Sequence, residues 1–293
     1  MHFKFEIVFF CTPNKKYFKE TRKKFGNVEN FPYLCAIKTQ KITMSAKTIV
    51  IANHKGGVGK TTTVAALASA LSASGLMVLM VDLDAQCNLT ETYVQNYDGR
   101  SVYDAIDEEK DLPVISCCEN AFLHLVPASE DLIAADIDFC RKDRHLLSRM
   151  LDKVRDEYDF ILIDTPPAIG IITIMAIVAG SSLVVPTTPE KYSVQGLQRL
   201  LKAVGNIRKG FGSHIEFVGI VLTRYEQNAA SHKYCEEQLE AQFTGQIFHT
   251  RIRKNIKVVD SQMANQSLLE YSPKSAAAMD YKSLAIELLT KIK

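Results

Sequence analysis

A glycine-rich loop places the strongest constraint on the fold of this chain. It separates an apolar segment from a helical one and reads Lys55-Gly56-Gly57-Val58-Gly59-Lys60-Thr61-Thr62. Glycines let backbone N–H groups approach a crowded anion, and a helix that starts at the end of such a loop adds the positive end of its dipole. The strict G-x-x-x-x-G-K-[ST] pattern is not met, because His54 occupies its first position and a second lysine, Lys55, follows it. The loop still predicts a site for the phosphate groups of a nucleotide.

Segments that suit strands alternate with segments that suit helices after residue 46. We expect strands at Thr48–Ala52, Met77–Asp82, Phe160–Asp164, Ser182–Pro186 and Glu216–Thr223. We expect helices at Lys60–Ser74 and at about Val194–Ile207, Ser231–Phe243 and Ser275–Ile292. Continuous apolar runs within the later strands are typical of strands that are covered on both faces. The sequence therefore predicts an α/β fold of the P-loop NTPase type, doubly wound, with a mostly parallel sheet and helices on both faces.

The first 46 residues differ from the remainder of the chain. They are rich in lysine and aromatic residues without a clear period, and Met44 stands just before the first predicted strand. We expect the P-loop domain to cover residues 47–293 and residues 1–46 to be an extension that is disordered or not native, with Met44 as the biological start. A small DNA-binding headpiece is the alternative, but the segment lacks the pattern of two helices that such a headpiece needs.

The composition limits the cellular setting of the protein. A formal net charge of +2 is too small to imply a nucleic-acid or membrane partner by itself. The seven cysteines include no C-x-x-C pair, which suits reduced thiols in a cytosolic protein better than a metal or disulfide site. No apolar run approaches the roughly 20 residues that cross a bilayer, and the start lacks the pattern of a signal peptide. We therefore expect a cytoplasmic protein.

Two further segments bring carboxylates to the edge of the sheet where the loop lies. Met80–Asp84 ends the second predicted strand, and Phe160–Asp164 ends a later one. The carboxyl ends of parallel strands meet at one edge of a sheet, which is where ligands bind in open α/β folds. The two acidic strand ends are therefore expected beside the phosphate loop.

These residue types suit nucleotide hydrolysis with Mg²⁺. Lys60 would bridge the β- and γ-phosphates, and the Thr61 hydroxyl would contact Mg²⁺. Asp164 would hold the same ion through water. Either Asp82 or Asp84 would orient or deprotonate the attacking water.

At this point the chain resembles the ParA/MinD family of deviant Walker A ATPases, and within it the ParA and Soj partition proteins. The resemblance covers residues 47–291. Beyond the loop, it is carried by Val81-Asp82-Leu83-Asp84 with Gln86 and Asn88, Ile163-Asp164-Thr165-Pro166-Pro167, Tyr192-Ser193-Val194-Gln195-Gly196-Leu197, Val221-Leu222-Thr223-Arg224 and Tyr271-Ser272-Pro273-Lys274-Ser275.

The resemblance implies roles for individual residues. In that family the extra lysine, here Lys55, reaches across an ATP-bound dimer to the partner's phosphates, as an arginine finger does. The family's catalytic aspartate lies twenty-four residues after the loop lysine, which selects Asp84 and leaves Asp82 in a supporting role. Asn255 matches a residue that contacts the adenine. ATP and Mg²⁺ are the implied ligands, and a slow ATPase stimulated by a partner is the implied enzyme.

The sequence departs from the family in the segment that follows the catalytic aspartate. Where the family usually reads Asp-Pro-Gln-Gly-Asn, this chain has Asp84-Ala85-Gln86-Cys87-Asn88. Ala85 replaces the family's proline, which restricts the backbone, and Cys87 replaces its glycine, which allows the backbone more conformations. A nucleotide-binding switch with weak hydrolysis is therefore an alternative function. Cys87 would lie close to the γ-phosphate, either as a redox-active thiol or as a small space-filling one.

The resemblance also implies partners. ParA-type proteins bind nonspecific duplex DNA as ATP-dependent homodimers, become associated with the nucleoid, and respond to a ParB-like centromere-binding protein. The residues proposed here for DNA are Arg224, Arg251, Arg253, Lys254 and Lys257, with Lys202, Arg208 and Lys209 as further neighbours.

A membrane-associated positioning ATPase of the MinD type is the second alternative. It would need an amphipathic basic helix beyond the last core helix. Only Thr290-Lys291-Ile292-Lys293 follow the segment expected to pack on the core, so we expect no membrane partner.

Overall fold

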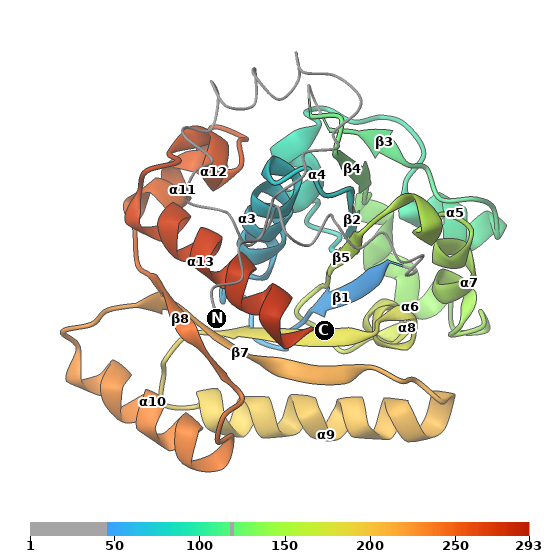
Figure 1. Cartoon of the computed structure of the whole chain (residues 1–293). Helices are drawn as coiled ribbons and strands as arrows, with labels where there is room; N and C mark the ends of the chain where they lie inside the picture. The colour runs from blue at the N-terminus through green and yellow to red at the C-terminus, as the bar shows by residue number, and fades with distance from the viewer. Residues whose placement is uncertain (1–45, 118–119, 293) are drawn as a thin grey trace, which may run out of the picture.

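The computed structural model describes residues 46–117 and 120–292, and these form one twisted sheet between two layers of helices (Figure 1). The expected extension, residues 1–46, lies outside the described residues except for Ala46. The sheet has eight strands in the order β3-β4-β2-β5-β1-β6-β7-β8. Their bounds are β1 Lys47–Ile51, β2 Val78–Asp82, β3 Ile115–Ser116, β4 Leu123–Val126, β5 Phe160–Asp164, β6 Ser182–Thr187, β7 Glu216–Tyr225 and β8 Ile247–Arg253. All neighbours are parallel except β3 and β4.

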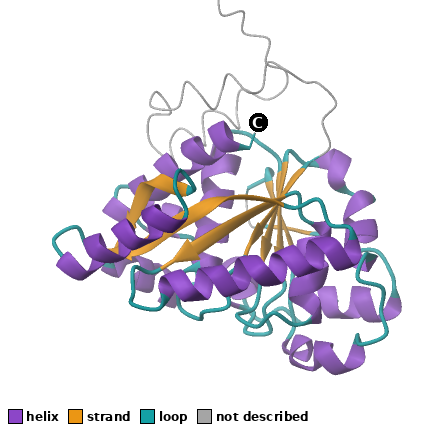
Figure 2. Ribbon diagram, turned by 90° about the horizontal axis from the view of Figure 1, so that it is seen from below, coloured by secondary structure: helices purple, strands orange, loops and turns teal. Residues whose placement is uncertain are grey.

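Helices cover both faces of this sheet, as Figure 2 shows. One face carries α3 (Lys60–Ala73), α4 (Asn88–Tyr93), α11 (Ile256–Met263), α12 (Leu268–Tyr271) and α13 (Ala276–Lys291). The other carries α5 (Val102–Glu108), α6 (Ala135–Asp138), α7 (Leu146–Asp152), α8 (Ile171–Ala179), α9 (Ser193–Phe211) and α10 (Ala230–Gln242). Two short 3₁₀ turns, η2 (Glu130–Ala134) and η3 (Arg155–Glu157), precede α6 and β5. None of the described helices is long and apolar enough to cross a membrane.

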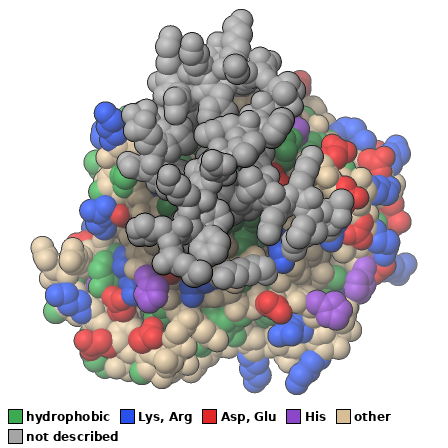
Figure 3. Space-filling model, in the orientation of Figure 1, with side chains coloured by type: hydrophobic (Ala, Val, Ile, Leu, Met, Phe, Trp, Pro, Cys, Tyr) green, Lys and Arg blue, Asp and Glu red, His purple; other side chains and the backbone are tan. Residues whose placement is uncertain are grey.

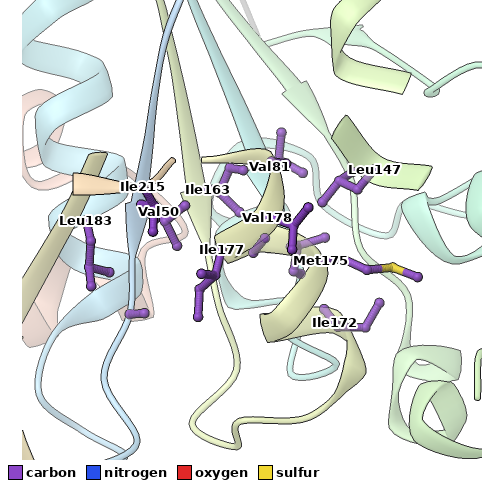
Figure 4. Close-up of a cluster of buried hydrophobic side chains, with 14 of the residues drawn as sticks. Val50, Val81, Leu147, Ile163, Ile172, Met175, Ile177, Val178, Leu183 and Ile215 are labelled. Carbon is purple, nitrogen blue, oxygen red and sulfur yellow. The ribbon is translucent and has the colours of Figure 1, made fainter. Parts of the chain in front are cut away.

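The strands at the centre are apolar on both faces because each face packs against helices. Val50, Val81 and Ile163 project from three neighbouring strands toward Ile172 and Met175 of α8 (Figure 4). On the opposite face, Ile49, Ile51, Met80 and Leu162 belong to a second buried cluster with α3 and α13. The alternation of the two sets along each strand follows from the two-residue period of a β-strand. The central strands, which carry the site, are thus fixed from both sides.

The elements predicted from sequence are present, with bounds that differ by a few residues. The predicted strand Phe160–Asp164 has the same ends in the structure, and the helix expected at Lys60–Ser74 ends at Ala73. The helix expected at Val194–Ile207 extends to Phe211. The mostly parallel, doubly wound α/β fold with helices on both faces is therefore confirmed. Strands β3, β4 and β8 and the helices α4, α5, α6, α7, α8, α11 and α12 were not predicted.

Candidate nucleotide-binding site

The glycine-rich loop connects β1 to α3 and is fixed from outside by hydrogen bonds. The Asn53 amide donates to Pro186 O at 2.7 Å and to Thr187 Oγ1 at 3.0 Å, and its carbonyl accepts from Lys55 N at 3.0 Å. On the other side, Thr223 Oγ1 donates to Val58 O at 2.7 Å. These bonds tie the loop to β6 and β7, so its conformation is held by the sheet.

The loop leaves its own N–H groups free. Gly57 and Gly59 have φ values of 72° and 87°, which only glycine adopts without strain. Within the described residues, no acceptor takes a hydrogen bond from the backbone N–H groups of residues 56–62, and the first bond of α3 runs from Thr63 N to Gly59 O at 2.9 Å. An added Cβ at Gly56 or Gly57 would meet nothing within 4 Å. A row of unpaired N–H groups around open space is the arrangement that binds phosphate.

Asp164 lies at the end of β5, fully buried, between the ends of β1 and β2. Its register partners are Ile51 on β1 and Asp82 on β2. Neither carboxylate oxygen of Asp164 has a hydrogen-bond partner among the described residues. Burial first, and then the negative charge of Asp82, raise the pKa of Asp164 well above its usual value, while the nearby Thr61 hydroxyl and the positive charge of Lys60 lower it. Two orphaned buried oxygens fit a hydrated cation, which would satisfy them.

Asp82 has a different environment, although it is equally buried. Its carboxylate accepts hydrogen bonds from Thr90 N at 2.8 Å, from Thr90 Oγ1 at 2.7 Å and from Asp84 N at 3.1 Å. Burial nevertheless raises the pKa of Asp82 to about 6, despite these hydrogen bonds. Asp82 thus fixes the backbone of Asp84 and the start of α4. Its oxygens are already engaged, whereas those of Asp164 are free.

Asp84 stands after the end of β2, half-buried, with one oxygen accepting from Gln86 N at 3.1 Å. The second loop lysine, Lys60, is buried, and burial lowers its pKa while the charges of Asp164 and Asp84 raise it. Both aspartates therefore lie close enough to Lys60 to act on its charge. The loop and the two acidic strand ends meet at one edge of the sheet.

Cys87 holds the position where the family usually has glycine, and it adopts the conformation of a glycine. Its φ of 53° lies in the left-handed region, at the N-terminus of α4. Burial, followed by the charge of Asp82, raises the pKa of the thiol to about 12. A thiol that stays protonated is a poor nucleophile, so the structure favours the space-filling role of Cys87 over the redox role.

Lys55 does not turn into its own loop. Its ammonium forms an ion pair with Glu190 and lies 3.5 Å from Thr188 Oγ1, both on the segment that joins β6 to α9. The Lys55 and Glu190 side chains are 42% and 55% exposed, so the pair can open without burying a charge. Sequence reasoning missed Glu190, because the pairing joins residues 135 positions apart.

His54 completes the loop and contacts the same helix. A Cβ added at Gly196 of α9 would lie 2.5 Å from His54 Cε1, so the imidazole occupies the space that the glycine leaves. Partial burial, and then the charge of Arg199, lower the pKa of His54. His54 therefore touches the first turn of α9, and Lys55 touches the segment that leads into it.

The remaining predicted contacts lie on β7, β8 and α11. Asn255 caps α11 by accepting a hydrogen bond from Lys257 N at 2.9 Å. The basic residues proposed for DNA are mostly engaged with carboxylates: Arg251 with Glu236, Arg253 with Asp280, Lys254 with Glu226 and Lys257 with Asp260. Arg224, exposed at a φ of 51°, forms no ion pair with another described residue.

Comparison with known proteins shows which family the chain belongs to. The family described as "AAA domain" matches residues 46–217. The chromosome-partitioning ATPase Soj of Thermus thermophilus is 32% identical over 245 residues, which cover 83% of this chain and 96% of that protein. The chain belongs to the ParA/Soj family of partition ATPases. Its glycine-rich loop and both acidic strand ends lie within the matched region.

Solved structures place this ParA/Soj chain in a wider fold group. The ATP complex of a McdA variant from Cyanothece superposes with a TM-score of 0.75 at 23% identity, covering 85% of this chain and 98% of that one. Cobyrinic acid a,c-diamide synthase from Mycobacterium smegmatis, with bound ADP and magnesium, gives a TM-score of 0.71 at 24% identity over 82% of this chain and 92% of that one. The fold is thus shared by proteins with different tasks.

Proposed function

We propose that this ParA/Soj protein is a DNA-partition ATPase in which ATP binding gates homodimer formation and the dimer binds duplex DNA without sequence preference. One observation carries the proposal. The glycine-rich loop presents its free N–H groups beside the unpartnered Asp164, whereas Lys55 is directed to Glu190, outside its own loop. A lysine that leaves its own phosphate site and is held at the surface suits a role at the phosphates of a second copy.

The phosphate groups would be held by the backbone N–H groups of residues 56–62 and by the buried ammonium of Lys60. Thr61 Oγ1 and Asp164 are the groups that would hold Mg²⁺, the latter through water. When bound, Mg²⁺ neutralises charge that develops on the phosphate oxygens. Asn255 would contact the adenine with its amide nitrogen, because its carbonyl oxygen already caps α11.

Hydrolysis would depend on Asp84. A water that attacks the γ-phosphorus must lose a proton while the bond to the β–γ bridging oxygen breaks, giving ADP and inorganic phosphate. Asp84 follows β2 directly, and Asp82 fixes its backbone N–H at 3.1 Å. These contacts would support Asp84, since Asp82 accepts from its backbone N–H and Gln86 N donates to its carboxylate, in a chain where Cys87 replaces the flexible glycine of the family.

Lys55 would couple hydrolysis to dimerisation. In a single subunit Lys55 pairs with Glu190, so the phosphate site of that subunit has the charge of Lys60 but lacks the charge of Lys55. In a dimer it would move to the partner's phosphates, where a supplied cation raises the rate by on the order of 10³ to 10⁵. A ParB-like partner would stimulate this step, and ATP turnover would then release the protein from the nucleoid to the cytoplasm.

Cosedimentation tests the choice of partner. The full chain is mixed with duplex DNA or with anionic liposomes, each with ATP and with ADP, at several salt concentrations. We expect pelleting with DNA in ATP only, weaker at higher salt. Pelleting with liposomes alone would refute the DNA-partition function and favour the MinD-like one.

Two variants separate binding from hydrolysis. Lys60→Ala should abolish productive ATP binding, because the buried cation of the loop is lost. Asp84→Ala should bind ATP, form the dimer and fail to hydrolyse, as measured by phosphate release and by light scattering. Asp98→Ala, an exposed carboxylate away from the loop, is the control and should hydrolyse normally. Normal turnover by Asp84→Ala would remove its catalytic assignment.

A further inference from the structure

Helix α9 carries a row of hydrogen-bond donors on its exposed face. Its 19 residues contain no aspartate or glutamate. Five exposed side chains fall at helical spacing on one face, namely Gln195, Arg199, Lys202, Asn206 and Lys209. Residues at these intervals lie within a stripe about 80° wide, because successive residues of an α-helix are about 100° apart. We refer to these five residues as the α9 stripe.

The cations of the α9 stripe differ from the other basic residues expected at the DNA surface, Arg251, Arg253, Lys254 and Lys257, which we call the β8–α11 cluster. Within the described residues, none of Arg199, Lys202 and Lys209 forms an ion pair. The four cations of β8 and α11 each hold a carboxylate of their own chain, and would have to give up that pair to bind phosphate. An unpaired cation only has to release counterions when it binds a phosphate. Its contact therefore costs less free energy than the contact of a cation that must first leave a carboxylate.

The shape of the α9 stripe suits an extended polyanion. From Arg199 to Lys209 it runs about 15 Å along a straight helix, at 1.5 Å per residue. Phosphates on one strand of a duplex follow one another at about 3.4 Å of rise along the duplex axis, so the stripe is long enough to meet more than one of them. Its two amides can donate to phosphate oxygens between the cations. Lys and Arg side chains project from the lower edge of the molecule in Figure 3, where α9 lies in Figure 1.

A lipid surface is a poorer match for this helix. Leu197, Leu200, Val204 and Ile207 of α9 are buried against the sheet, and Phe211 at the end of the helix is the exposed large apolar side chain of α9. A helix that binds a bilayer must instead insert an apolar face. The stripe therefore offers charge and hydrogen bonding without apolar area to insert.

We propose that the α9 stripe is the main surface with which this protein binds the phosphate backbone of duplex DNA. The proposal rests on the DNA-binding function proposed above and assigns that function to residues outside the β8–α11 cluster. The assignment also places the proposed DNA surface next to residues of the phosphate loop, through which nucleotide binding would affect it. His54 packs on Gly196, and Lys55 pairs with Glu190 just before the helix, so release of Lys55 would act at the start of α9.

Salt-dependent DNA binding tests the assignment. Fluorescence anisotropy with two unrelated duplexes, in the presence of ATP, is compared for the wild-type chain and Lys202→Ala/Lys209→Ala. Each lost phosphate contact lowers the slope of log K against log salt by about 0.9, so we expect the slope to fall by nearly two with both duplexes. ATP turnover without DNA should stay unchanged. Lys202→Arg/Lys209→Arg should restore the slope, which separates charge from folding.

The matched control is Arg253→Ala/Lys254→Ala, which removes two cations that are already paired, and its slope should change by less than half a unit. An unchanged slope in Lys202→Ala/Lys209→Ala, or a larger loss in the control, would overturn the assignment to α9 while leaving DNA binding in place. If the wild-type chain binds neither duplex in ATP, the proposed function itself fails and the assignment fails with it. Liposome binding that depends on the two lysines would also refute it.

Discussion

Replacing Asp164 by asparagine should stabilise the nucleotide-free protein and also remove its response to Mg²⁺ and ATP. The carboxylate is fully buried, has no hydrogen-bond partner among the described residues and stands next to the equally buried Asp82. Asparagine has almost the same shape and no charge. The substitution therefore removes an electrostatic cost of folding and, with it, the group that would hold the cation.

The size of the effect follows from the raised pKa of Asp164. Each pKa unit corresponds to about 1.4 kcal/mol of folding free energy. The pKa is raised well above its usual value, but the variant also deprives Lys60 of a neighbouring negative charge. We therefore expect the free energy of unfolding of the variant to exceed that of the wild-type chain at neutral pH. In a domain of this size each kcal/mol gained raises Tm by about 2–4 °C.

The pH dependence gives the sign of the effect independently. In the unfolded chain Asp164 ionises near its usual pKa of about 4, whereas in the folded protein its pKa is higher. Between these two values the folded state binds a proton that the unfolded state lacks, so wild-type stability falls as pH rises. Asp164→Asn has no carboxylate to ionise at this position and does not lose stability in this way. The difference in free energy of unfolding between the variant and the wild-type chain should be absent below about pH 4 and should reach its full size above the pKa that Asp164 has in the folded protein.

Thermal and urea unfolding from pH 4 to pH 8, with EDTA and without nucleotide, measure both effects. Addition of ATP and Mg²⁺ should then raise the Tm of the wild-type chain and leave Asp164→Asn unchanged. Asp84→Asn is the matched control, because its half-buried carboxylate accepts a hydrogen bond from Gln86 N and should change nucleotide-free stability little. A less stable Asp164→Asn at neutral pH, or a gain that does not vary with pH, would refute the reasoning.

Two further predictions concern the support of the site. Thr90→Val should lower the free energy of unfolding by about 2–3 kcal/mol in urea, because Thr90 Oγ1 donates to Asp82 at 2.7 Å and accepts from Ala128 N at 2.9 Å, whereas Thr90→Ser should retain most of the stability. Equal losses in both variants would contradict this account. Gly196→Ala should weaken ATP binding a few-fold by calorimetry, because the new methyl group would displace His54, and the double variant with His54→Ala should recover the affinity. No recovery would show that the methyl group acts elsewhere.

The phosphate loop and the acidic strand ends could be predicted because their determinants are local. The glycines between Lys55 and Thr62, placed between an apolar strand and a helix, permit the conformation of a phosphate loop, and Asp84 and Asp164 follow or end strands whose apolar pattern is visible. Parallel strands in the order β2-β5-β1 then bring these ends together. Strand β8 and the short helices were missed, because their formation depends on packing against distant segments more than on a strong pattern of their own.

The charged partners were decided by the tertiary structure. Nothing in the sequence around Arg253 indicates that Asp280 of α13 accepts hydrogen bonds from its Nε and Nη2 atoms, nor that Glu190 pairs with Lys55, 135 residues away. The same packing leaves the cations of α9 without an ion pair to any other described residue. The sequence by itself thus determined which chemistry the chain carries, since that depends on residue types at short spacing. Only the folded structure decided which cations are free, because an ion pair depends on distance in space and not on distance along the chain.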